Sequence, residues 1–260
     1  MKTLRLISLA VRYHWDSQKS NPANLFAAVF GMILNNGLAV WGLWAMLFDG
    51  KPDGKQLTVY FLALNGMITI AWGSVCFFLG GLHSLSTHVE DGSLDPMLAT
   101  PRNPILLVAI SNSLTAALGD VIQGSLTIVI LFFIASWTEA LRCVLFSFIG
   151  IFAVMGLFIF TGCIPFWMKR GSSLSILMRE MCLALSFYPS SKIFNGMSRT
   201  LVYLTPALVV GILPIDAVET GTWSSSFIAT SASIAFFFAT VQLFGFSLKR
   251  YQTSNYVMAR

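Results

Sequence analysis

The chain has 260 residues, of which 56% are hydrophobic and only 10% are charged, and its formal net charge is +5 at pH 7. A soluble domain carries about 25% charged residues, so this composition cannot cover a water-facing surface. It also excludes a disordered chain, a secreted disulfide scaffold and a nucleic-acid binder. We therefore expect an all-α integral membrane protein with several spans, in which the excess of Lys and Arg sets the orientation.

The first segment, residues 1–22, is too charged to span a bilayer but has a helical period. Polar side chains recur every three or four residues from Arg5 to Lys19, and apolar ones follow a separate stripe that includes Trp15. This pattern predicts a helix in the cytoplasmic membrane interface, with a solvated helical tail as the alternative. Asn21 and Pro22 are typical of the cap and first turn of a following helix.

Six segments are interpreted as spans, because a crossing takes about 20 apolar residues. They are residues 25–48, 57–82, 105–136, 144–167, 172–188 and 223–248. Prolines divide residues 189–214 into short apolar pieces. Because broken helices at membrane depth must pack within protein or line a wet cavity, we interpret this segment as a re-entrant helical hairpin before the last span. The whole chain, 1–260, is then a single transmembrane domain.

Charge predicts the orientation of these segments. With the N-terminus inside and six crossings, both termini are cytoplasmic. All Lys and Arg residues then lie on the cytoplasmic side except Lys51, Lys55, Arg142, Lys192 and Arg199. This asymmetry follows the usual enrichment of basic residues in the cytoplasmic loops of membrane proteins.

The longest polar interruption contains the string HVEDGSLDPMLATPRNP at residues 88–104. Asp91 and Gly92 favour a turn, and Ser93 or Asp95 is suited to cap a short helix in which Pro96 takes an early position. One interpretation is an ordinary polar connection, and the other is a rigid docking element for a soluble partner.

In the docking interpretation, the acidic side chains offer charge to the partner. Leu94 and Met97 offer an apolar knob that fills a pocket of the partner, the kind of contact that dominates interface energies. The candidate residues of this docking loop are His88, Glu90, Asp91, Gly92, Leu94, Asp95, Pro96, Met97 and Leu98.

The sequence carries none of the common signatures of a catalytic or nucleotide-binding site. It contains no GxxxxGK[ST], HExxH or GxSxG pattern. The cysteines Cys76, Cys143, Cys163 and Cys182 lack metal-ligand spacing, and we expect buried free thiols. We therefore expect a chain that is not an enzyme and binds no cofactor or metal itself.

A few polar residues fall inside the expected spans. Asp120, with Gln123 one turn further on, is either functional or a structural group that reaches water or a neighbouring helix, because a carboxylate in a span is costly. Arg179 and Glu180 are either functional or mark the place where a span emerges. Asparagines at three positions are expected to form hydrogen bonds between helices: Asn35, Asn36 and Asn65.

Three strings of the sequence resemble those of ABC-2 type transporter permeases. The first is EDGSLDPMLATPRNP at residues 90–104, which is similar to the family signature of Gly-x-Leu-Asp, a later Leu and a Pro before an apolar run. The second is FYPSSKIFNGMSRTL at residues 187–201, and the third is GFSLKRYQTSN at residues 245–255. The resemblance covers nearly the whole chain in order.

This resemblance implies a six-span membrane subunit of an ABC exporter in the bacterial inner (plasma) membrane. It implies a dimer with a second copy or a paralogous permease, and separate ATPase subunits that bind ATP and Mg²⁺. The loop at residues 88–98 would then couple the ATPase to the spans. Two alternatives stay open: an ion-coupled secondary carrier that uses Asp120, and an intramembrane lipid-modifying enzyme that uses Asp120 and Glu180.

Overall fold

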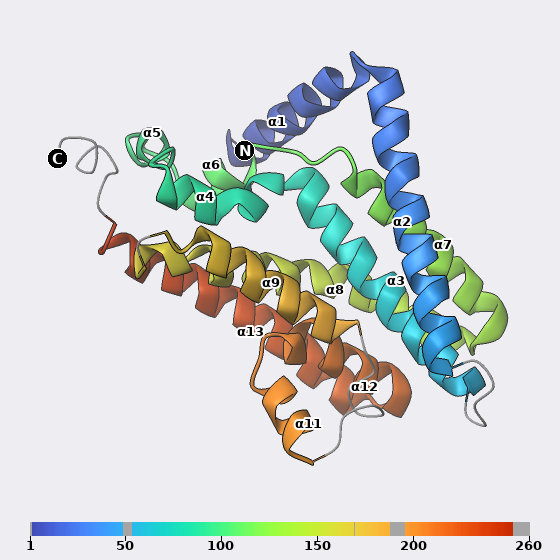
Figure 1. Cartoon of the computed structure of the whole chain (residues 1–260). Helices are drawn as coiled ribbons and strands as arrows, with labels where there is room; N and C mark the ends of the chain where they lie inside the picture. Colours follow the sequence, from blue (N-terminus) through green and yellow to red (C-terminus); the bar gives the residue numbers. More distant parts are fainter. Residues whose placement is uncertain (1, 49–53, 169, 188–195, 252–260) are drawn as a thin grey trace.

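The computed structural model describes residues 2–48, 54–168, 170–187 and 196–251, and every regular element in these ranges is a helix (Figure 1). Expectations for residues 49–53, 189–195 and 252–260 lie outside the described residues. In chain order the elements are α1 (Lys2–Lys19), α2 (Pro22–Phe48), α3 (Gly54–Phe78), η1 (Gly80–Ser84), α4 (Leu85–Glu90), α5 (Asp95–Leu98), α6 (Pro104–Ala109), α7 (Ala117–Ile134), α8 (Trp137–Gly162), η2 (Ile164–Phe166), α9 (Ser172–Ser186), α11 (Gly196–Tyr203), η3 (Leu208–Ile212), α12 (Leu213–Thr220) and α13 (Trp223–Leu248).

Five helical segments of the described chain are long and apolar enough to cross a bilayer. They fall in α2, α3, α7, α8 with η2, and α13, and they overlap five of the six expected spans. The remaining expected span contains α9, which has 15 residues. At a rise of about 1.5 Å per residue, α9 reaches about 22 Å, less than the roughly 30 Å hydrocarbon core. The sixth crossing therefore stays a prediction.

The helix α3 occupies the centre of the bundle. It packs against α7 and α8, and α8 packs in turn against α13. Glycine permits the close approach of α3 and α7, because a Cβ atom built on Gly66 would lie 2.7 Å from Ile128 Cδ1, and one on Gly124 would lie 2.8 Å from Ile70 Cγ1. Such contacts between small residues are typical of helix packing in membranes.

The N-terminal helices lie on the outside of this bundle. The helix α2 packs mainly on α7 and exposes an apolar stripe that includes Phe26, Phe30 and Leu38, as suits contact with lipid. The helix expected within residues 1–22 is present as α1, Lys2–Lys19, and its position in the membrane interface stays a prediction. His14 Nε2 lies 3.1 Å from the carbonyl oxygen of Ile110, so α1 is attached to the segment after α6.

Capping side chains explain where two of the long helices begin. Asn21 Oδ1 accepts a hydrogen bond from the N–H of Asn24 at 3.2 Å, with Pro22 at the first helical position, as expected. The helix α8 begins earlier than the expected residue 144. Ser136 and Glu139 form a reciprocal capping box, which starts the helix at residue 137.

The continuous span expected at residues 105–136 is instead divided between α6 and α7. Its break contains polar residues that hydrogen-bond across the chain to the end of α3. The Ser113 hydroxyl donates to the Phe77 carbonyl at 2.7 Å, and the Leu114 N–H donates to the Cys76 carbonyl at 3.1 Å. Because the Leu114 N–H finds its partner outside its own helix, the helical ladder stops and restarts at Ala117.

The described part of the expected hairpin at 189–214 also differs from the prediction. The helix α11 is followed by a π-helical turn, η3, which leads directly into α12. Pro214 does not end this run, because it lies within the first two residues of α12, where a missing N–H breaks no helical bond. The run ends at Gly221, which has a φ of 67° in the left-handed region that glycine adopts readily. The re-entrant membrane position stays a prediction.

Candidate functional site

The segment between α4 and α5 is a tightly hydrogen-bonded turn. Gly92 has a φ of 78°, in the left-handed region that is costly for other residues. Asp91 Oδ1 accepts from the N–H of Ser93 at 2.9 Å, and the N–H of Leu94 donates to the His88 carbonyl at 3.1 Å. The hydroxyl of Ser93 also lies 2.6 Å from His88 Nδ1. The turn expected at Asp91 and Gly92 is therefore present, and its side chains hold it closed.

The short helix α5 does not have the capping side chain that the sequence predicts. Neither Ser93 nor Asp95 caps it, because the N-cap residue is Leu94 and no side chain bonds to that helix end. The hydroxyl of Ser93 is used by His88 instead. Pro96 does take the expected early position in α5.

The prediction that Leu94 offers an apolar knob to a partner is wrong. The Leu94 side chain is fully buried, with 0% of its surface exposed, and belongs to the main core of this chain. Met97 and Leu98 are half-buried and pack against the same core, whereas Pro96 is exposed. Leu94 therefore anchors the loop to the bundle, and the outer surface of α5 is formed by other residues.

Two of the three loop acids form hydrogen bonds with distant parts of the chain. Glu90 Oε2 accepts from the backbone N–H of Ser172, the first residue of α9, at 2.8 Å. Asp95 Oδ1 accepts from the Tyr251 hydroxyl, beyond the end of α13, at 2.6 Å. The third acid, Asp91, is exposed. The loop thus contacts the ends of two helices that lie far from it in the sequence.

These contacts gather several helix ends at one end of the bundle. Figure 1 shows α4, α5 and α6 on the same side of the molecule as the beginning of α1 and the end of α13. The contacts of Ser172 with Glu90 and of Tyr251 with Asp95 place the beginning of α9 and the end of α13 there as well. We call the region of residues 85–103 at this end the loop platform.

A buried arginine links α9 to the entrance of the loop platform. The Arg179 side chain donates from Nη1 to the His83 carbonyl at 2.7 Å and lies with its guanidinium 5.6 Å from the centre of the Phe158 ring. Its Nε also lies 3.2 Å from Oε1 of the half-exposed Glu180. Arg179 itself is only 3% exposed and is held within the protein by these contacts.

Asp120 and Gln123 are buried within the bundle, where α7 faces its neighbours. Asp120 lies in the first turn of α7, which favours a negative charge, and its Oδ1 accepts from Asn36 Nδ2 of α2 at 2.6 Å. This bond confirms the expected interhelical role of Asn36. Gln123 donates to Thr127 Oγ1 at 3.0 Å, whereas its Oε1 has no hydrogen-bond partner among the described residues.

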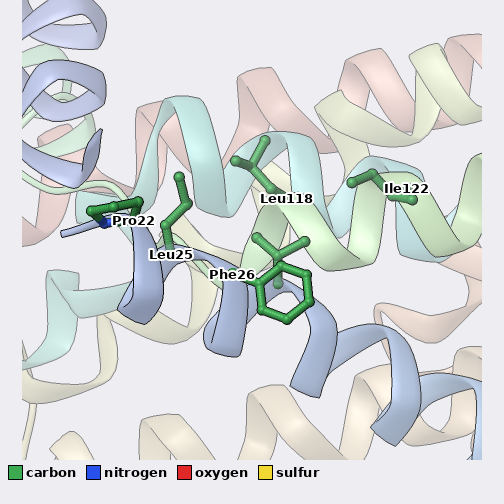
Figure 2. Close-up of a pocket in the computed structure, with 6 residues that line it drawn as sticks. Pro22, Leu25, Phe26, Leu118 and Ile122 are labelled. Carbon is green, nitrogen blue, oxygen red and sulfur yellow. The ribbon is translucent and has the colours of Figure 1, made fainter. Parts of the chain in front are cut away.

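An apolar pocket of about 290 Å³ lies between the first turns of α2 and α7. Figure 2 shows Pro22, Leu25 and Phe26 of α2 facing Leu118 and Ile122 of α7. Val29 completes the lining, and all the lining residues are apolar. The pocket therefore offers shape and hydrophobic contact, without a polar group that would orient a ligand.

The partners of the loop acids, Tyr251 and the N–H of Ser172, were not predicted from the sequence. Tyr251 belongs to the quoted string at residues 245–255 and Asp95 to the string at 90–104, so both motifs were visible but their contact was not.

Among the residues that the structure describes, no three His, Cys, Asp or Glu side chains gather into a potential metal site. The four cysteines are buried and unpaired, as expected.

Comparison with known protein families gives one match. A family model described as ABC-2 family transporter protein matches residues 55–255. This range includes the loop platform, α7, α9 and all of the described C-terminal part. Comparisons with curated proteins and with solved structures found no match.

Proposed function

Because this chain belongs to the ABC-2 transporter family, whose members are membrane subunits of ABC transporters, we propose that it is the permease of an ATP-driven exporter. The permease forms the translocation path as a dimer, with a second copy or a paralogous permease. Separate ATPase subunits bind ATP and Mg²⁺ and act on the spans through the loop platform. The complex lies in a bacterial inner membrane, with both termini of this chain in the cytoplasm.

The observation that carries this proposal is the construction of the loop platform. Leu94 anchors it in the core, and Glu90 and Asp95 attach it to the ends of α9 and α13. A force applied to α5 would therefore reach several spans together. At the same time Asp91 and Pro96 are exposed, and Pro96 lies where a partner can contact it.

The course of α9 supports six crossings. Its beginning contacts α4 and η2 beside the loop platform, and the helix also contacts η3, which leads into α12 and then α13. It therefore runs from the platform end of the bundle to the end at which α13 begins. With its flanking residues, α9 would form the fifth of six crossings, which returns both termini to one side of the membrane.

Docking of the ATPase is tested at the exposed residue Pro96. We expect Pro96→Arg to reduce co-purification of the ABC ATPase that accompanies the wild-type permease by at least about tenfold, because a large charged side chain then occupies the docking surface. The matched control is Ser224→Arg, an equally exposed position at the beginning of α13 and the opposite end of the bundle.

Four outcomes bear on the proposal. Loss of the ATPase in Pro96→Arg but not in Ser224→Arg supports docking at the platform. Wild-type protein that purifies without any ABC ATPase contradicts the exporter, and ATP-independent transport that requires Asp120 would favour an ion-coupled carrier instead. Retention of the ATPase in both variants contradicts docking at Pro96.

A further inference from the structure

A side-chain hydrogen bond attaches the chain just beyond α13 to α5. The hydroxyl of Tyr251 donates to Asp95 Oδ1 at 2.6 Å, although the two residues are 156 positions apart. Asp95 is the first residue of α5, and Tyr251 follows the last turn of α13. The bond therefore joins the loop platform to the last span at a point where the backbone provides no direct connection.

Aromatic contacts hold the tyrosine in place. The Tyr251 ring packs edge-on against Phe166, with ring centres 5.8 Å apart, and Phe166 packs in the same manner against Phe244 of α13. The Arg250 guanidinium lies 4.0 Å from the centre of the Trp167 ring. Because the ring is fixed by these neighbours, its hydroxyl is oriented towards Asp95 before any movement of α5.

The chemistry of the pair determines which residue donates the hydrogen bond and which one accepts it. Burial, together with the hydrogen bond to Asp95, raises the pKa of Tyr251 above its usual range. The phenol therefore keeps its proton and acts as the donor. A hydrogen bond to a carboxylate is also shorter and stronger than one between neutral groups.

A neighbouring contact joins the platform to a second helix. Glu90 Oε2 accepts from the Ser172 N–H, one of the donors that have no partner within α9 at its N-terminal end. The platform is thus bonded to the ends of α9 and α13. In contrast, its connection to α7 runs directly through the chain by way of α6.

We propose that Tyr251 and Asp95 are a positioning pair that transmits displacement of α5 to α13 during the ATPase cycle. This proposal rests on the proposed function, because it requires an ATPase that acts on α5. Movement of α7 does not depend on this pair, since α5 reaches α7 through the backbone of α6.

The experiment uses two variants, each with one introduced cysteine, in proteoliposomes that contain the permease and its ATPase. Ser224→Cys reports on the far end of α13, and Thr138→Cys reports on the link between α7 and α8; both positions are exposed. A membrane-impermeant maleimide is added with and without ATP and vanadate, and the change in labelling rate is measured at each position.

Tyr251→Phe keeps the ring against Phe166 and removes only the hydroxyl. We expect it to reduce the ATP-dependent change in labelling at position 224 about tenfold, the scale of one hydrogen bond to a charged group, and to leave position 138 unchanged. Asp95→Ala should have the same effect, and the double variant should be no worse than either single one. Asp95→Asn keeps an acceptor oxygen and should retain most of the change.

ATPase co-purification separates this proposal from the proposed function. It should be equal to wild type in Tyr251→Phe, because Tyr251 lies outside the loop platform. A wild-type protein without ATPase would refute the proposed function before the pair is tested. With the ATPase bound, an unchanged response at position 224 in Tyr251→Phe would overturn the proposal. Loss of the response at both positions would overturn it too, because the effect would then not be specific to α13.

Discussion

Arg179 holds the backbone of His83 through a 2.7 Å hydrogen bond from its Nη1 to the His83 carbonyl. The His83 ring itself packs edge-on against Trp72 and Phe158, with ring centres 6.0 Å and 5.6 Å away. A buried cation thus lies beside a histidine that has aromatic neighbours. Burial among these rings and the positive charge of Arg179 both oppose a second positive charge at this site, at the entrance to the loop platform.

The pH dependence of stability follows from this arrangement. Burial, and then the charge of Arg179, lower the pKa of His83 from its usual value of 6.5 to about 4. The unfolded chain therefore binds a proton at a higher pH than the folded protein does. Consequently this contribution to stability is complete above about pH 6.5 and is lost as the pH falls towards 4.

We expect His83→Gln to remove this part of the pH dependence. Thermal unfolding in detergent, measured at about pH 7.5, 6 and 5, should show a steeper loss of stability in the wild type than in His83→Gln. Parallel curves for the two proteins would show that His83 does not titrate differently in the folded state.

The hydrogen bond between Asp120 and Asn36 should respond differently to a neutral polar and to an apolar replacement of Asp120. In Asp120→Asn an oxygen can still accept from Asn36, so we expect unfolding stability within about 0.5 kcal/mol of wild type. In Asp120→Leu the Asn36 amide loses this acceptor, which should cost about 1–3 kcal/mol. Thermal unfolding measures both variants.

A transport assay separates the roles of Asp120. A stable Asp120→Asn protein that has lost transport would assign a functional charge to this position. A protein that keeps both properties would show that the carboxylate serves as a hydrogen-bond acceptor between α2 and α7. Equal stability of Asp120→Leu and wild type would contradict the structural role of the bond.

The local parts of this structure were accessible from the sequence, and the nonlocal parts were not. Asn21 and Pro22 predicted the start of α2, because a cap and a first-turn proline act within four residues. The break before α7 was missed, since Ser113 and Leu114 bond to carbonyls of α3. Burial of Leu94 was missed for the same reason, because one apolar residue in a polar loop does not indicate which distant part of the chain it packs against.

The orientation of the chain is tested by cysteine labelling in sealed cells. The native cysteines are buried, so a cysteine at an exposed site can be labelled over a low background. We expect a membrane-impermeant maleimide to label Ser224→Cys from outside and to label Thr100→Cys only after the cells are opened. Labelling of both positions from outside, or of Thr100→Cys alone, would exclude the proposed topology.

The anchor role of Leu94 predicts a loss of stability that its neighbour does not share. Leu94→Ala removes a fully buried side chain from the core and should cost about 2–5 kcal/mol, whereas Pro96→Ala alters an exposed position and should cost much less. Thermal unfolding in detergent gives both values. Because the ATPase would contact the outer surface of α5, Leu94→Ala protein that is still folded at low temperature should bind the ATPase. An unchanged unfolding temperature combined with a loss of ATPase binding would show instead that Leu94 contacts the partner directly.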